Sequence, residues 1–232
     1  FREMHLYAEA EAIADEVLEA LEAGGLFKSV YKAGSLRRGK RILKDIDILT
    51  IPKPKANPEK LRAALTALAD SLPNAGGVIA EGETKVSIRR RGLQIDFRLV
   101  LPESEASALQ HFTGSKEHNT LLRSRAKGMG LKMNEYGVFK GEKPLPLVGE
   151  EAVYRSIGLP FIPPEIREGE EEVEAAEAGR LPDLLEAGGI RGMIHVHSRW
   201  SDGLTSIEEM ALECRRLGYG WLALSDHSRS AG

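Results

Sequence analysis

The chain has little cysteine, few aromatic residues and no long apolar run. One cysteine, Cys214, stands among 232 residues, so no disulfide can form within the chain, and this is typical of a reducing compartment. Aromatic residues make up 6% of the sequence. No apolar run approaches the roughly 20 residues that a membrane helix needs, and no signal-peptide pattern opens the chain. We therefore expect a cytoplasmic globular protein with no membrane partner.

Charges of the two signs are unevenly distributed along the chain. The formal net charge is −3, but residues 28–140 alone carry +11 and the remaining residues carry −14. A basic block within an acidic chain indicates a polyanionic partner for that block. A solvated basic surface explains the same composition equally well.

Hydrophobic periodicity divides the chain into helices and strands. We expect helices over 4–23, 57–72, about 113–127 (capped by Thr113 or Ser115) and 206–217, and strands over 26–33, 45–51, 77–81, 84–90, 93–101, 192–197 and 221–225. Tight glycine-containing turns join the three central strands, which should form an antiparallel meander. The β-α-β order near the end predicts the opening of a separate α/β domain. Because the chain begins with Phe1 and stops soon after an expected strand, we expect a piece of a longer protein.

Acidic side chains gather on the expected strand over 45–51. Asp45 and Asp47 are separated by Ile46, and side chains alternate along a strand, so both carboxylates leave the same face. Two carboxylates so close repel each other, and a cation between them removes that repulsion. Asp96 lies on a later strand and completes a cluster of three if the two strands are neighbours. Three carboxylates can hold two divalent ions about 3.5–4 Å apart, and their hard oxygen ligands suit Mg²⁺.

A glycine–serine pair precedes these carboxylates. Gly34 lets the backbone approach a phosphate closely, and Ser35 offers a hydroxyl at the start of an expected helical turn. Arg37 and Arg38 follow within a turn, where an arginine fork can neutralise triphosphate oxygens. A lone D-x-D pair usually consists of surface carboxylates, but its combination with G-S and a later aspartate is much more specific for a functional site.

Three segments together resemble the nucleotidyltransferase palm of family X DNA polymerases, the group that includes DNA polymerase beta. They are GSLRRG at 34–39, DIDIL at 45–49 and ID at 95–96. The resemblance implies a DNA polymerase that uses two Mg²⁺ or Mn²⁺ ions, binds deoxynucleoside triphosphates and fills gaps in primer–template DNA.

The same resemblance implies a role for each matching residue. Asp45 and Asp47 would bind both metals, and Asp96 would bind the catalytic metal and assist the primer 3′-hydroxyl. Gly34, Ser35 and Arg38 would hold the phosphates of the incoming nucleotide.

The segment HFTGSKEHN at 111–119 is similar to the loop that opens the nucleotide-selecting subdomain of this family. The resemblance implies that Phe112 packs under the sugar, that Gly114 lines the nucleotide site and that Asn119 reads the minor-groove edge of the incoming base. A minor-groove acceptor is common to all correct pairs, so one amide can check geometry without selecting a sequence. Arg123, one helical turn after Asn119, and Lys85 would contact the DNA.

The chain departs from the polymerase beta pattern at two positions. Position 111 is His where that type has Tyr, which bears on sugar discrimination. Position 94 is Gln where that type has Arg, which removes a positive neighbour of the third carboxylate. The segment 134–136 matches the family and is expected to have a packing role. A second interpretation of His111 and Phe112 is core or rim packing.

Histidines and aspartates gather near the end of the chain. His195 and His197 alternate on an expected strand, so both imidazoles should share a face. Asp202 follows five residues later, and His227 follows the next strand together with Asp226. Such groups at adjacent strand ends form a plausible metal site. Asp202 fits a turn equally well, and Asp226 fits a carboxylate that orients His227.

This last stretch resembles the start of a PHP (polymerase and histidinol phosphatase) domain, which follows the polymerase core in bacterial family X enzymes. The resemblance implies that His195, His197, Asp202 and His227 are ligands of a Zn²⁺ or Mn²⁺ site with 3′–5′ exonuclease or phosphoesterase activity. The remaining ligands come from later strands, so we expect this chain not to form the full site.

These observations predict an α+β nucleotidyltransferase palm, with a mixed sheet and helices on one side, and a small α/β thumb-like subdomain, a linker and the truncated start of an α/β PHP barrel. The expected bounds are 1–101, 102–160, 161–189 and 190–232, in that order. We expect a monomeric, nucleoid-associated, template-directed DNA polymerase. The alternatives are a template-independent nucleotidyltransferase of the same superfamily and a fragment that binds gapped DNA without turnover.

Overall fold

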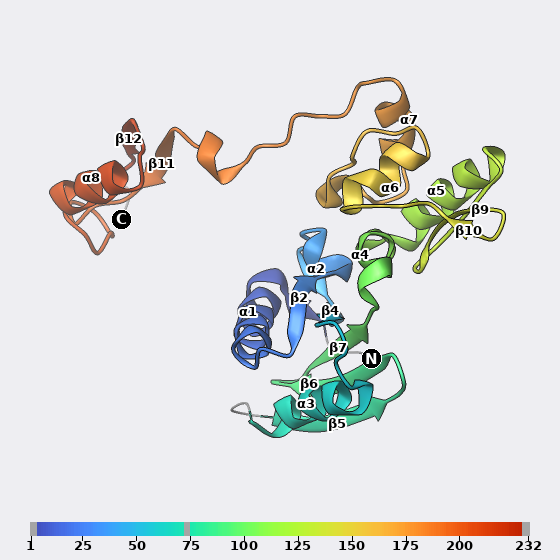
Figure 1. The fold of residues 1–232 in the computed structure, drawn as a ribbon. Coiled ribbons are helices and arrows are strands. Elements are labelled where there is room, and N and C mark those ends of the chain that lie inside the picture. Colours follow the sequence, from blue (N-terminus) through green and yellow to red (C-terminus); the bar gives the residue numbers. More distant parts are fainter. Residues whose placement is uncertain (1–3, 72–74, 229–232) are drawn as a thin grey trace. The chain divides into compact units, whose positions relative to one another are not determined.

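The computed structural model describes residues 4–71 and 75–228. It divides the chain into two compact units, one ending at Leu181 and one beginning at Pro182. Each unit has its own elements, which Figure 1 labels in chain order. Within the described residues, no helix combines the length and the apolar character needed to cross a bilayer.

A five-stranded mixed sheet forms the palm of the first unit. In spatial order its strands are β2 (Phe27–Lys32), β4 (Asp45–Pro52), β7 (Leu93–Leu99), β6 (Lys85–Arg90) and β5 (Ala75–Glu81). β4 and β7 run parallel, and every other neighbouring pair is antiparallel. The expected mixed sheet and its antiparallel meander are therefore confirmed.

Two helices, α1 (Tyr7–Ala23) and α3 (Pro58–Ser71), cover one face of this sheet. Ile46 and Ile48 point from β4 into the core that these helices form with the sheet. Each such side chain contributes roughly 1.5–3 kcal/mol when it is fully buried. The alternation that sends the isoleucines into the core sends the acidic side chains of β4 to the opposite face.

The helix ends have local causes. α1 begins at Tyr7, later than expected, because β1 (His5–Leu6) pairs with β3 (Ile42–Leu43). Asn57 caps α3, since its Oδ1 accepts the backbone N–H of Glu59 at 2.8 Å. The expected last residue of that helix, Leu72, lies outside the described residues.

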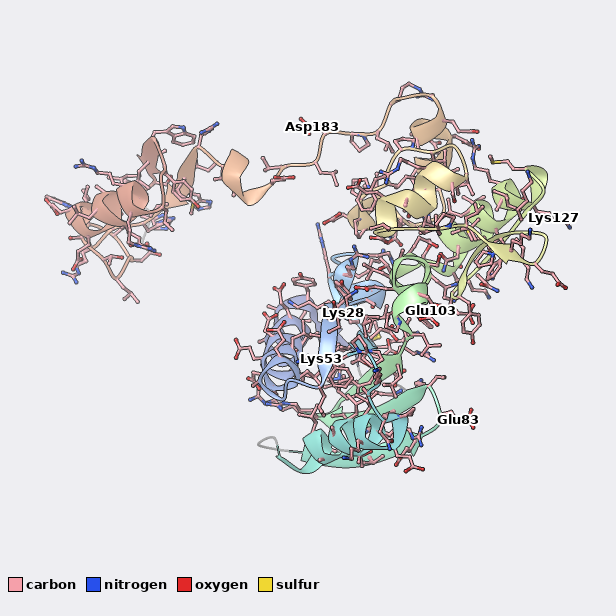
Figure 2. The ribbon with its side chains drawn as sticks, in the orientation of Figure 1. Lys28, Lys53, Glu83, Glu103, Lys127 and Asp183 are labelled. Atoms are coloured by element: carbon pink, nitrogen blue, oxygen red, sulfur yellow. The ribbon has the colours of Figure 1, made fainter. Side chains whose placement is uncertain are left out.

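The thumb-like subdomain follows the palm. It consists of α4 (Glu105–Thr113), α5 (Lys116–Gly128), β8 (Leu131–Asn134), β9 (Gly137–Lys140), β10 (Lys143–Pro144), α6 (Glu150–Ser156) and α7 (Glu172–Glu177). Ser115 caps α5 by accepting the backbone N–H of His118 at 3.1 Å. Ala108 of α4 packs on Leu49 of β4, so α4 crosses the polar face of the sheet. Lys28 of β2, which Figure 2 labels, pairs with Glu105 at 2.7 Å and fastens the same helix to the palm.

The acidic segment after residue 160 differs from the expected linker. Up to residue 181 it folds onto the thumb, where Val173 and Ala176 of α7 join the core. Glu172 is buried because its carboxylate accepts three hydrogen bonds, from the backbone N–H groups of Gly169 and Glu170 and from the His118 ring. Charge compensation by neighbours therefore lets an acidic sequence fold against a core.

The second unit has the predicted β-α-β order. β11 (Gly192–Val196) and β12 (Trp221–Leu224) are parallel, and α8 (Ile207–Arg216) connects them. Ser206 caps α8 in a capping box with Glu209.

Candidate functional site

The three predicted carboxylates lie on the polar face of the palm sheet. Asp45 and Asp47 leave β4 on the face opposite its core isoleucines. In the parallel register of β4 and β7, Asp47 lies directly beside Asp96, and Asp45 lies beside Gln94. The sheet therefore brings Asp96 next to Asp47, as the strand pattern predicted.

Asp47 carries the electrostatic cost of this arrangement. Burial, together with the charges of Asp45 and Asp96, raises the pKa of Asp47 from 3.8 to about 6. Lys85 and Arg98 partly offset the rise. A cation beside these oxygens would remove the repulsion, and an all-carboxylate donor set fits a hard divalent ion.

Asp96 is compensated by the protein itself. Its Oδ1 accepts hydrogen bonds from Ser87 Oγ at 2.7 Å and from Gln94 Nε2 at 2.9 Å, and its Oδ2 pairs with Lys85 Nζ at 2.6 Å. Burial alone would raise the pKa of Asp96, but these donors outweigh it and hold the pKa below its usual value. Lys85, predicted to contact DNA, therefore lies against a carboxylate of the site.

The glycine–serine turn fits closely against Asp47. α2 (Gly34–Arg37) follows β2, and Ala33 donates its N–H to the carbonyl of Asp47 at 2.8 Å. Gly34 has φ 58°, and a Cβ at this position would overlap Oδ2 of Asp47. Only glycine combines this conformation with such a close approach. The turn thus places Ser35 beside the carboxylates.

A polar cleft of about 630 Å³ joins the palm site to the thumb. Its lining includes these predicted residues: Gly34, Ser35, Arg38, Asp45, Asp47, Phe112, Gly114, Asn119 and Arg123. His111 also lines it, and its ring contacts Phe112 edge-on with centroids 5.0 Å apart. The structure thus brings together residues that lie almost ninety positions apart in the chain.

Arg98 is a cleft residue that the sequence reasoning did not assign. Its guanidinium lies over the Phe112 ring, 5.0 Å from the centroid, and it lowers the pKa of Asp47. The signal was present, because Arg98 lies two positions after Asp96 and therefore shares its face of β7.

The two arginines after the turn have different surroundings. Arg38 lines the cleft and donates to the Thr113 carbonyl at 2.6 Å and to Glu168 at 3.2 Å. Arg37, also expected beside phosphates, pairs instead with Glu150 of α6 at 2.7 Å. Gly114 has φ 72°, and a Cβ there would lie 3.1 Å from Arg38 Nη1, so glycine leaves room for this arginine.

Asn119 is held inside the thumb. Its Oδ1 accepts from Gln110 Nε2 at 2.8 Å, and its Nδ2 donates to the His111 carbonyl at 2.7 Å. Arg123 donates to the backbone carbonyl of Asn119 at 3.2 Å. The amide nitrogen carries a second N–H, with which it could donate to a base while it keeps both of these hydrogen bonds.

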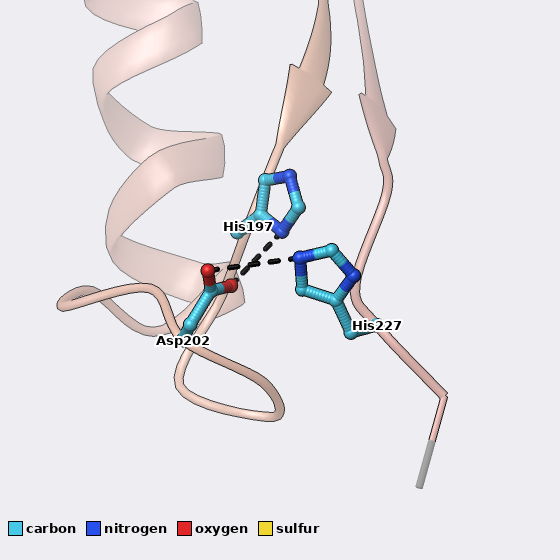
Figure 3. A group of neighbouring side chains, drawn as sticks. All are labelled: His197, Asp202 and His227. Carbon is cyan, nitrogen blue, oxygen red and sulfur yellow. Dashed lines mark ion pairs between the residues drawn. The ribbon is translucent and has the colours of Figure 1, made fainter. Parts of the chain in front are cut away.

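The second unit brings together three of the four predicted metal ligands. The ligand atoms of His197, Asp202 and His227 all lie within 4.8 Å of one another (Figure 3). His195 is outside this group, although its ring centroid lies 5.2 Å from that of His197. The strand is irregular at this point, because His195 has φ 58° and the β11–β12 register shifts between Met193 and Val196.

Asp226 does not orient a histidine. Its carboxylate accepts from the backbone N–H and the hydroxyl of Ser198, both at 2.6 Å, and from Ser201 Oγ at 2.7 Å. The carboxylate that pairs with His227 is that of Asp202, at 3.6 Å.

Comparison with known proteins gives the family. The family model "DNA polymerase beta thumb" matches residues 108–168. The chain is 30% identical over 154 residues to "Repair DNA polymerase X" of African swine fever virus (isolate Tick/Malawi/Lil 20-1/1983), and the match covers 61% of this chain and 83% of the viral protein. The chain belongs to the X family of DNA polymerases.

A bacterial family X polymerase matches nearly the whole chain. The chain is 42% identical over 224 residues to "DNA polymerase/3'-5' exonuclease PolX" of Bacillus subtilis, which covers 94% of this chain. The chain spans 37% of the length of that relative.

Structural comparison supports the same fold. The crystal structure of Leishmania infantum polymerase beta in its ternary P/T complex is similar with a TM-score of 0.62 and 23% identity, over 72% of this chain and 77% of that one. Family X polymerases generally depend on divalent metal ions.

Proposed function

We propose that this chain catalyses template-directed transfer of a deoxynucleoside monophosphate to a primer 3′-hydroxyl, with release of pyrophosphate, in the filling of short DNA gaps. One observation carries the proposal. Asp47 and Asp96 are register partners on neighbouring strands, and Asp45 and Asp47 line the cleft. Family membership supports it independently.

The carboxylates of Asp45, Asp47 and Asp96 would hold a pair of Mg²⁺ or Mn²⁺ ions. Their donor set fits hard cations, and the pKa of Asp47 is raised chiefly by burial and further by repulsion from Asp45 and Asp96, which such ions would relieve. When bound, these ions supply charge neutralisation and a lowered pKa of the attacking hydroxyl. The chain itself contributes fixed positions, because two donors lock Oδ1 of Asp96.

The cleft would bind the nucleotide through its phosphates, sugar and base. Ser35 and Arg38 lie where they can bind phosphate oxygens, and the Thr113 carbonyl orients the Arg38 guanidinium. Phe112, held by Arg98, offers a flat surface for the sugar. Gly114 leaves the room that this arrangement needs.

The DNA partner is proposed from charge and from the relatives. The basic block over 28–140 carries +11, and two solved neighbours are Leishmania infantum polymerase beta in ternary complexes, a P/T complex and a gap complex. Arg123 lines the cleft, and we propose that it contacts the template strand while Asn119 reads the minor-groove edge. Binding should weaken steeply with salt, because phosphate contacts release counterions.

Primer extension on a one-nucleotide gap tests the proposal. Wild-type chain should add the nucleotide complementary to the template base, and Asp96→Ala should abolish addition while DNA binding remains. Addition that ignores the template base would favour the template-independent nucleotidyltransferase. DNA binding without addition by the wild type would favour the fragment that only binds DNA.

For the second unit we propose a metal site. His197, Asp202 and His227 present three ligand atoms to one point, which suits Zn²⁺ or Mn²⁺. The relative in Bacillus subtilis is named a 3'-5' exonuclease as well as a polymerase, and we propose that this unit is part of such a phosphoesterase. Metal analysis should show bound Zn²⁺ that is lost in His197→Ala, and equal metal content in both proteins would refute the assignment.

A further inference from the structure

Both oxygens of the Asp96 carboxylate already accept hydrogen bonds in this structure. Oδ1 accepts from Ser87 and Gln94, and Oδ2 accepts from the Lys85 ammonium at 2.6 Å. Since a carboxylate offers about four lone-pair sites, one remains on Oδ2, and a divalent ion that binds there shares this oxygen with the Lys85 ammonium.

The three donors differ in how easily they leave. Ser87 is buried, and Gln94 belongs to the same strand as Asp96 and is two residues away. Both are neutral, and both hold Oδ1 in place. The side chain of Lys85 is 35% exposed and carries its ammonium at the end of a flexible aliphatic chain, so the ammonium can move into solvent at small cost. A cation also repels the ammonium but not the neutral donors.

The charge that faces Asp96 comes from β6 in this chain. Position 94 of β7 carries a neutral amide, and Lys85 enters from the neighbouring strand β6 with Arg98 as its register partner. Lys85 also lowers the pKa of Asp47, so its charge acts on more than one carboxylate of the cluster.

We propose that Lys85 is a positioning residue whose ammonium occupies the metal-facing oxygen of Asp96 in the metal-free protein and is released when a divalent cation binds. The inference rests on the proposed function, because it takes Asp96 to be a metal ligand. Lys85 keeps the cluster compact before the metal arrives, and it lowers the affinity of the empty site for the metal.

Titration with Mn²⁺ of the full chain, without DNA or nucleotide, tests this competition. Free Mn²⁺ is measured by electron paramagnetic resonance, and the Mn²⁺ bound at the palm is the fraction that Asp47→Asn removes. Lys85→Gln should lower the Kd of that fraction by about five- to ten-fold, the size of one charge-assisted hydrogen bond between a partly exposed ammonium and a buried carboxylate. Lys85→Arg keeps the charge and should stay within about two-fold of wild type.

Lys44→Gln is the matched control. Lys44 is exposed and directly precedes Asp45, so its substitution removes the same charge near the cluster without touching Asp96. It should change the Kd by less than about two-fold, since exposed charges are screened. Thermal melts give a second readout. Without metal, Lys85→Gln should melt at a lower temperature than wild type, and Mn²⁺ should raise the melting temperature of Lys85→Gln by more than that of wild type.

The outcomes separate the two proposals. If Lys85→Gln binds Mn²⁺ no more tightly than Lys44→Gln, the competition is refuted while the metal site stands. If Asp47→Asn removes no Mn²⁺, the proposed metal site fails and the role of Lys85 fails with it.

Discussion

The substitution Asp47→Asn should stabilise the metal-free protein. Asp47 has a pKa raised from 3.8 to about 6, chiefly by burial. A raised pKa of an acid means that the folded state favours the protonated form. The contribution of this group to stability is therefore full at low pH and is lost as the pH rises through about 6. An amide at this position keeps the neutral form at every pH.

The size of the effect follows from the shift. A rise in the pKa of Asp47 from 3.8 to about 6 corresponds to about 3 kcal/mol of folding free energy, and partial solvent exposure reduces this to about 1–2 kcal/mol. For a chain of this length that is a rise of roughly 3–6 °C in Tm at pH 8. At pH 5 about half of the gain should remain, because the side chain is still ionised in the unfolded chain, and the gain should vanish only below about pH 4.

Differential scanning fluorimetry in EDTA at both pH values measures this directly. Asp183→Asn, in the second unit, is the control and should leave the Tm of the first unit unchanged. Added Mn²⁺ should raise the Tm of wild type but not that of Asp47→Asn. A lower Tm for Asp47→Asn at pH 8 in EDTA, or an equal gain at pH 5, would refute the reasoning.

Three further substitutions test other parts of the account. Gly34→Ala should lower the stability of the first unit by about 1–3 kcal/mol and abolish gap filling. Gly39 has a similar φ but open space around it, so Gly39→Ala should lower the stability by less. Equal losses of melting temperature and activity in the two variants would contradict the close approach of Gly34 to the Asp47 carboxylate. Glu172→Ala should destabilise the first unit by about 2–4 kcal/mol in urea denaturation, whereas Glu174→Ala, at an exposed position, should cost less than about 0.5 kcal/mol. Equal effects of the two substitutions would indicate that the acidic segment is a solvated linker. Glu168→Gln should lower the KM for the nucleotide about two- to five-fold, because its carboxylate competes with phosphate for two cations; an unchanged KM counts against this.

Strand alternation explains why much of the palm could be predicted from the sequence. A period of two places Asp45 and Asp47 on one face whatever the surrounding fold, and the isoleucines between and after them identify the buried side. The sequence alone could not predict that β4 pairs with β7, because strand register depends on contacts between segments that are distant in the chain. The cluster of three carboxylates was therefore predicted only on the condition that the two strands are neighbours.

The rest depends on partners that are remote in the chain. Lys85 meets Asp96 only because β6 turns back on β7, and no local pattern distinguishes it from a DNA-binding lysine. The segment over 161–181 looks like a solvated linker because its charges are visible in the sequence, whereas the partners that compensate them lie on α5 and α6. The positive φ of His195 is likewise a local irregularity that the residue types alone do not indicate.

Anomalous diffraction at the manganese edge, from crystals soaked with Mn²⁺ and a deoxynucleoside triphosphate, shows whether the three palm carboxylates bind divalent cations. We expect manganese peaks in the palm, bounded by Asp45, Asp47 and Asp96, with the triphosphate extending toward Ser35 and Arg38. Bound nucleotide with no manganese between these three carboxylates would contradict this expectation.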